Sequence, residues 1–112
     1  MKERITWSDF EKIDIRVGTV VSVEIFKEAR NPAFKMSIDF GSLGIKKSSA
    51  QLTKLYSLNE IIGTQVAAIV NFPPKQIATI MSECSVLGVI GEDESVTLLK
   101  PERNVQNGLS IG

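Results

Sequence analysis

Residues 12–26 read KIDIRVGTVVSVEIF, and this stretch decides the fold class. Apolar residues recur at every second position in two runs, formed by Ile13, Ile15 and Val17 and then by Val21, Val23 and Ile25. A period of two is typical of a half-buried β-strand. Gly18 separates the two runs, and a glycine inside a strand commonly marks a bulge or a sharp bend. We therefore predict one long strand that turns a barrel corner at Gly18.

Several shorter strand patterns follow this stretch. The sequence FKMSIDF (residues 34–40) alternates strictly between apolar and polar side chains. Further strands are expected at residues 45–53, 64–72, 82–91 and 95–102. Between the third and fourth strands, residues 54–63 are expected to form a short helix or turn that ends at Gly63.

These elements predict an all-β protein. A long bent first strand, five or six strands in total and one short helix fit the five-stranded Greek-key barrel called the OB-fold, here with short helical segments and N- and C-terminal extensions. An SH3-like barrel is the alternative that periodicity leaves open. With 112 residues, the chain is expected to form a single domain over residues 1–112.

The composition excludes several classes of site. The chain has no histidine and one cysteine, so histidine-based catalytic triads, histidine-ligated zinc and thiolate metal clusters are excluded within one chain. We therefore expect no enzyme, no metal and no cofactor. No apolar run approaches the roughly 20 residues of a membrane-spanning helix, and residues 1–3 lead into no signal-peptide core. The prediction is a cytoplasmic protein without membrane insertion. Cys84 is expected to be a small buried residue.

The charges are unevenly distributed although the formal net charge is zero. Residues 27–75 hold seven bases and three acids, and the balance reverses after Lys75. Such asymmetry can create a local positive face on a neutral protein, although an ordinary solvated surface would account for it equally well.

The segment AAIVNFPPKQI (residues 67–77) ends the apolar fourth strand with a rigid corner. Pro73 and Pro74 lack backbone donors and fix the φ angle, so they terminate strand pairing. Phe72 could then receive an apolar peptide side chain, stack on a nucleic-acid base, or point inward and plug the barrel. The corner is therefore either a simple turn or one wall of a ligand site.

The two ends of the chain carry apolar residues that are expected to pack against another surface. Thr6 and Asp9 have capping-box spacing, and Trp7 and Phe10 would share one side of a short helical turn. A single turn cannot bury such a pair, so it must pack on the domain or on a second chain.

Five blocks of the sequence together resemble one family, the tRNA-binding OB domains, and within it the CsaA-type secretion chaperones. The blocks are DIRVGTVVSVEIF, EARNPAFKMSIDFG, IKKSSAQLT, VNFPPKQI and SECSVLG. They span nearly the whole chain, and the DIRVG block also resembles the appended C-terminal domain of methionyl-tRNA synthetases. Two departures from those synthetase domains, SSA at residues 48–50 and NFPP at residues 71–74, favour a peptide ligand over tRNA.

The resemblance implies an export-related chaperone that binds unfolded or pre-secretory polypeptides as a homodimer. The chain contains no nucleotide-binding loop, so this activity is expected to be independent of ATP. Structure-specific tRNA binding is the alternative function, and salt dependence would separate it from apolar peptide binding.

The resemblance and the residue chemistry together give three sets of expected contacts. Peptide-binding residues are expected to be Phe34, Asn71, Phe72, Pro73, Pro74 and Gln76. Nucleic-acid contacts are expected from Arg30, Lys46, Lys47, Ser48, Ser49, Gln51 and Lys75. The dimer interface is expected to include Trp7, Phe10, Leu109 and Ile111.

Overall fold

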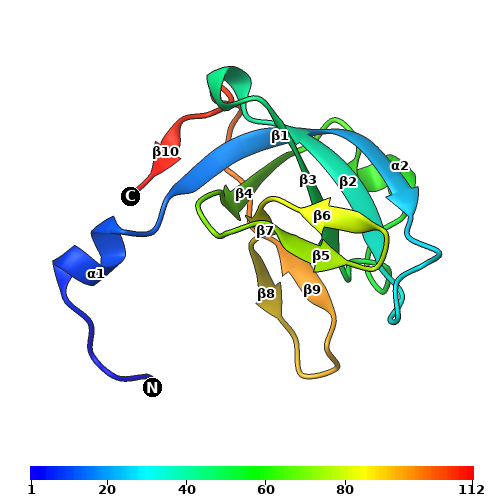
Figure 1. Cartoon of the computed structure of the whole chain (residues 1–112), viewed down its shortest axis with the longest axis horizontal. Coiled ribbons are helices and arrows are strands. Elements are labelled where there is room, and N and C mark those ends of the chain that lie inside the picture. The colour runs from blue at the N-terminus through cyan, green and yellow to red at the C-terminus, as the bar shows by residue number, and fades with distance from the viewer.

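A computed structural model describes all residues from 1 to 112 as an all-β barrel with short helices (Figure 1). The helical segments are α1 (Trp7–Glu11), the 3-10 turn η1 (Gly41–Leu43) and α2 (Leu58–Ile61). The strands of the first half are β1 (Ile15–Ile25), β2 (Phe34–Asp39), β3 (Ile45–Ala50) and β4 (Gln65–Ile69). The remaining strands are β5 (Lys75–Ile77), β6 (Ile80–Ser82), β7 (Ser85–Val86), β8 (Gly88–Ile90), β9 (Val96–Leu98) and β10 (Ser110–Ile111).

The main sheet confirms the predicted five-stranded OB-fold. Its strands pair in the order β3-β2-β1-β4-β7, and all neighbours are antiparallel. The sheet curls into a nearly closed barrel, and β10 adds to the start of β1. Two small hairpins, β5–β6 and β8–β9, lie outside the main sheet. None of the helices is long and apolar enough to cross a membrane.

The strict alternation of β2 places the core. Every second residue of this strand is buried, and its partners on β1, β3 and β4 fill the barrel from the other walls. The buried cluster consists of Val20, Phe34, Met36, Ile38, Phe40, Leu52, Ile61, Val66, Ala68 and Cys84. Ile61 enters it from α2, which begins with a capping box between Ser57 and Glu60 and is followed by Gly63 at φ +81°. The short helix predicted in residues 54–63 is therefore confirmed.

The predicted long strand is present as β1, but its bulge does not lie at Gly18. The register between β1 and β2 shifts between Val20 and Ser22. Gly18 is needed for a close approach: a Cβ there would lie 2.6 Å from Ile38 Cγ2 and 2.8 Å from the Phe40 ring. The bulge also turns Val21 out to solvent, with 44% of its surface exposed.

The C-terminal segment covers the outer face of β1 and β4. Val17 is buried, its N–H donates to the Leu109 carbonyl at 3.1 Å, and its carbonyl accepts from the Gly108 N–H at 2.7 Å. The Gln65 side chain binds the backbone of Val105 through both its amide nitrogen and its oxygen, at 2.6 and 3.0 Å. The tail is thus fastened to the barrel along its length.

Two sequence predictions about strands differ from the structure. The strand predicted at residues 82–91 is split into β7 and β8, because the chain leaves the main sheet after Val86. The hairpin β5–β6 was not predicted at all. Its turn places Ala78 at φ +47°, a conformation that a non-glycine residue rarely adopts and that no glycine signals in the sequence.

Replacing Gly18 with alanine is expected to lower the free energy of unfolding by about 1–3 kcal/mol, because Ile38 and Phe40 would have to move. Urea unfolding of both proteins measures the change. Ser22→Ala in the same strand is the control, since Ser22 is exposed and its replacement should be almost neutral. A Gly18→Ala protein as stable as the wild type would show that the close approach imposes no constraint.

Candidate functional site

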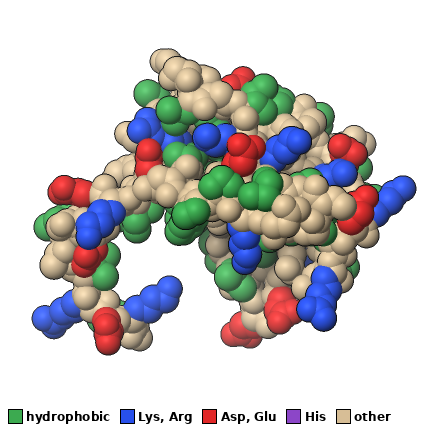
Figure 2. Space-filling model, in the orientation of Figure 1, with side chains coloured by type: hydrophobic (Ala, Val, Ile, Leu, Met, Phe, Trp, Pro, Cys, Tyr) green, Lys and Arg blue, Asp and Glu red, His purple; other side chains and the backbone are tan.

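The corner after β4 holds apolar side chains out to solvent. Phe72 is 56% exposed, so it does not plug the barrel. Pro73 and Pro74 follow, also exposed, and hairpin β5–β6 begins directly after them at Lys75. Hydrophobic side chains gather on this part of the surface, over the hairpin and the loop before it (Figure 2). The prolines fix the corner, so little conformational entropy would be lost if a ligand bound there.

A pocket of about 680 Å³ lies between this corner, β3 and β7. We call it the corner pocket. It brings together six of the predicted residues, namely Ser49, Phe72, Pro73, Pro74, Lys75 and Gln76. Five residues complete its lining, namely Ile77, Ser82, Glu83, Cys84 and Ser85. Recognising the hairpin in KQIATIMS would have brought Ile77 to the corner.

Glu83 fixes one wall of the corner pocket to β3. Its carboxylate accepts a hydrogen bond from the Lys47 N–H at 3.0 Å, and its own N–H donates to the Lys47 carbonyl at 2.8 Å. Next to this pair, the Ser48 hydroxyl donates to the Cys84 carbonyl at 2.9 Å. Because these bonds form within the chain, the wall is held in place without a ligand.

Cys84 lines the pocket, but its thiol is not a reactive group. Its side chain is buried, and this burial raises the pKa of the thiol to about 11. At neutral pH the group is therefore protonated, and a protonated thiol is a poor nucleophile.

Three predicted site residues are engaged within the protein itself. Phe34 and Ser48 belong to the core, with exposed fractions of 4% and 0%, so neither reaches a ligand. The Asn71 side chain accepts from the Asp14 N–H at 3.0 Å and donates to the Lys12 carbonyl at 2.7 Å. It therefore clamps the corner to the segment before β1. The expectation that Phe34 and Ser48 contact a ligand is corrected accordingly, whereas Asn71 is exposed and its contact with a ligand stays a prediction.

A small basic depression of about 130 Å³ lies on the outer face of β1, β2 and β3. Lys47 and Lys35 line it with Ser22, Ser37 and Glu24. Sequence reasoning singled out Lys47 but missed Lys35, although its place between Phe34 and Met36 already indicated the polar face of that strand.

The other predicted nucleic-acid contacts are scattered. Lys46 is paired with Ile38 and therefore points to the opposite face of β3 from Lys47. Arg30 is exposed in the loop between β1 and β2. Gln51 lines a separate cavity of about 600 Å³. The structure thus joins Lys47 to Ser49 on one face but does not gather the full set.

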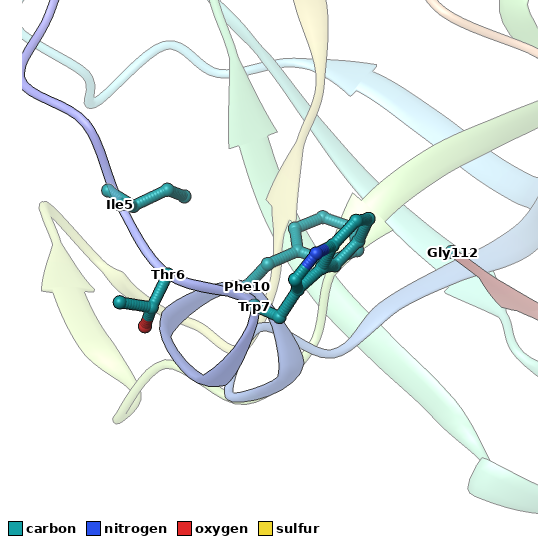
Figure 3. A pocket seen from close by; sticks show the side chains of 5 residues that line it. All are labelled: Ile5, Thr6, Trp7, Phe10 and Gly112. Carbon is teal, nitrogen blue, oxygen red and sulfur yellow. The ribbon is translucent and has the colours of Figure 1, made fainter.

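The N-terminal arm, residues 1–12, stands away from the barrel (Figures 1 and 2). Thr6 and Asp9 form the predicted capping box of α1. The Trp7 and Phe10 rings lie edge to face, with centroids 6.3 Å apart, and point to the same side of the helix (Figure 3). They line an open hollow of about 640 Å³ that ends at Gly112. Trp7 is 79% exposed, so the barrel of the same chain does not cover it.

The two predicted interface residues of the tail lie near the base of the arm. Ile111 pairs with Ile15 at the start of β1. Leu109 and Ile111 are 49% and 38% exposed. Both ends of the chain therefore present apolar surface.

Comparison with known structures gives close matches over the whole chain. The chaperone CsaA from Bacillus anthracis is 48% identical and superposes with a TM-score of 0.94, covering 98% of this chain and 100% of that one. The CsaA chaperone protein from Picrophilus torridus is 50% identical with a TM-score of 0.91, covering 97% of this chain and 100% of that one.

Among the curated relatives, the methionine–tRNA ligase of Methanococcoides burtonii is 33% identical over 110 residues. The match covers 98% of this chain but 16% of that ligase, so the chain corresponds to one part of a much longer enzyme. The family described as a putative tRNA-binding domain matches residues 15–110. The structural neighbours of the chain include CsaA chaperones, and the chain belongs to the tRNA-binding domain family.

Proposed function

We propose that this protein is an ATP-independent chaperone that binds unfolded or pre-secretory polypeptides as a homodimer. The observation that carries the proposal is the corner pocket, in which Phe72, Pro73 and Pro74 form an exposed apolar wall on a rigid loop. The likeness to chaperone CsaA along the whole chain supports the same function. We also propose that it acts in the cytoplasm, on clients destined for export.

The chemistry of the corner pocket suits polypeptide side chains. Its apolar wall offers surface to an aromatic or aliphatic side chain. The side-chain oxygens of Gln76 and Ser82 can accept hydrogen bonds from a main chain, while their donor groups bind the Ala78 and Cys84 carbonyls. Lys75 and Glu83 both line it, so the pocket carries charges of both signs and does not favour a polyanion. We therefore assign the polypeptide to the corner pocket.

The N-terminal arm supports the homodimer. A helix of five residues is not stable by its own hydrogen bonds, and the exposed Trp7–Phe10 pair needs a partner surface. A second copy would supply one, and two corner pockets held in one particle would bind a long unfolded chain with avidity.

The alternative function, structure-specific tRNA binding, rests on the basic depression. Lys35 and Lys47 lie there beside two serine hydroxyls, on the OB-fold face that commonly carries ligands. Lysine and serine are common partners of phosphate oxygens, and the family match is to a tRNA-binding domain.

Replacing Phe72 with alanine is expected to weaken binding of an unfolded polypeptide by about tenfold, since a large partly buried anchor is lost. Fluorescence titration at low and high salt measures the affinity, which should change little with salt because the contact is apolar. Ile62→Ala is the matched control, because Ile62 is 49% exposed and does not line the corner pocket. An equal loss of affinity in both variants would show that the corner pocket is not the polypeptide site.

Replacing Lys35 and Lys47 together with glutamine is expected to weaken tRNA binding, if tRNA binds the depression. The slope of log affinity against log salt should fall by about one to two, as two phosphate contacts are lost. A second double variant, Lys27→Gln with Lys100→Gln, removes the same charge from exposed positions outside the depression. An unchanged slope in the first double variant would contradict the tRNA site.

Replacing Trp7 with alanine is expected to raise the dimer dissociation constant by about tenfold or more, because Trp7 would be a central anchor of the interface. Sedimentation equilibrium of both proteins measures it. Val89→Ala, another exposed apolar position, serves as the control and should leave association unchanged. A wild-type protein that sediments as a monomer at micromolar concentration would contradict the homodimer.

A further inference from the structure

Asn107 and Gly108 form the one asparagine–glycine pair of the chain, in the tail (residues 104–112) that ends with β10 beside β1 (Figure 1). An asparagine before glycine is the pair most prone to deamidation, because glycine has no side chain to hinder attack by its own backbone nitrogen. The other four asparagines precede proline, glutamate, phenylalanine and valine, which hinder or prevent the same attack. The sequence therefore concentrates this chemistry at one peptide bond.

The reaction closes a five-membered ring and needs both reacting groups to be free. The backbone nitrogen of Gly108 gives up its proton and forms a bond to Cγ of Asn107. The bond from Cγ to Nδ2 breaks, and ammonia leaves. Water then opens the ring at either of its two carbonyl carbons, which gives isoaspartate or aspartate. No oxidant or reductant takes part, so the conformation of these two residues controls the rate.

The docked tail holds both reacting groups in hydrogen bonds. The Gly108 N–H donates to the Val17 carbonyl at 2.7 Å. The Asn107 side-chain oxygen accepts from the Thr19 hydroxyl at 2.8 Å and from the Gln65 amide at 3.0 Å. The Gly108 nitrogen therefore cannot reach Cγ of Asn107 while these bonds persist.

Close packing also fixes the backbone at this point. Gly108 has φ +92°, and a Cβ there would lie 2.5 Å from the Phe40 carbonyl oxygen. A Cβ on Gly41 would lie 2.6 Å from the Asn107 carbonyl oxygen. The two segments thus lie directly against each other, and the peptide between Asn107 and Gly108 has no room for the rotation that ring closure needs.

The tail can leave the barrel without unfolding it. It pairs with β1 through Ser110 and Ile111, and none of its residues belongs to the buried core cluster. Leu109 and Ile111 are 49% and 38% exposed. Segments with few buried apolar contacts open locally at a lower free energy than core strands do. Opening of the tail would free both reacting groups together.

We propose that Asn107 is a deamidation site that the docked tail protects, and that its modification releases the tail permanently. The proposal stands on contacts within one chain and does not depend on the chaperone function. Isoaspartate routes the main chain through the former side chain and so adds one carbon atom before Gly108. The Gly108 N–H can then no longer reach Val17 while an oxygen of residue 107 stays at Thr19.

The aspartate product weakens docking in a different way, because it adds a negative charge. Asp39 is paired with Thr19 across β1 and β2, so its side chain lies on the same face of the sheet as the Thr19 hydroxyl that binds residue 107. Asp39 also accepts a hydrogen bond from the Gly41 N–H at 2.8 Å, and Gly41 lies against Asn107. A second carboxylate beside this one destabilises the docked tail.

Peptide mapping by mass spectrometry tests the protection, after the intact protein has been incubated at mildly alkaline pH with and without urea. Native Asn107 should react about tenfold to a thousandfold more slowly than Asn107 in urea, because only the open tail reacts. Equal rates would show that the docked tail gives no protection. A native rate below this range would show that the tail stays closed and that the folded protein does not use the site.

Thr19→Val removes one hydrogen bond to the Asn107 side chain and keeps the shape of the threonine. The native rate should rise about fivefold, the factor that corresponds to about 1 kcal/mol for one hydrogen bond, while the rate in urea stays the same. Thr97→Val makes the same change at an exposed position on β9 and should alter neither rate. A Thr19→Val protein that reacts no faster than the Thr97→Val protein would contradict the proposed protection.

Amide hydrogen exchange followed by NMR tests the release of the tail, on modified protein separated by anion-exchange chromatography. The Val17 amide donates to the Leu109 carbonyl at 3.1 Å, so its exchange should become about tenfold or more faster after modification. The Val20 amide donates to the Thr64 carbonyl at 2.9 Å and is the internal control. Unchanged exchange at Val17, or equal acceleration at Val20, would overturn a selective release of the tail.

Discussion

The close approach at Gly18 is the constraint on which the barrel depends. Because this residue has no side chain, Ile38 of the neighbouring strand β2 and Phe40 just after it can pack directly against the backbone of β1. The same strand pairs with β4 and β10 in its first half and with β2 in its second half. A single long strand therefore sets the position of both walls of the barrel, and with them the place where β3 and β7 meet.

Side-chain to backbone hydrogen bonds turn this barrel into a preformed site. Asn71 joins the corner to the segment before β1, and Glu83 joins the start of β7 to β3. The prolines between these two clamps remove most of the remaining backbone freedom. The corner pocket consequently exists before a ligand arrives, which limits the entropy that binding would cost.

The sequence predicted those features that local periodicity controls. The alternation of residues 34–40 identified the buried face of β2, and the prolines correctly marked the end of the β4 pairing. Local sequence patterns could not show that Ser48 would be buried, because its burial depends on the Cys84 carbonyl, 36 positions away in the sequence. For the same reason, no local pattern revealed that Asn71 would be a clamp or that Gly18 would lie under Phe40. Hairpin β5–β6 was missed because its turn has Ala78 at a positive φ angle. A glycine or asparagine at that position would have indicated a turn in the sequence.

Chemical-shift mapping of an unlabelled unfolded polypeptide on the isotope-labelled protein, at high salt, tests the central claim most directly. The account predicts that the largest shifts fall on Phe72, Lys75, Gln76 and Ser85 and continue to Ser49 on β3. Shifts confined to the basic depression around Lys35 and Lys47, or to Trp7 and Phe10 on the arm, would contradict it.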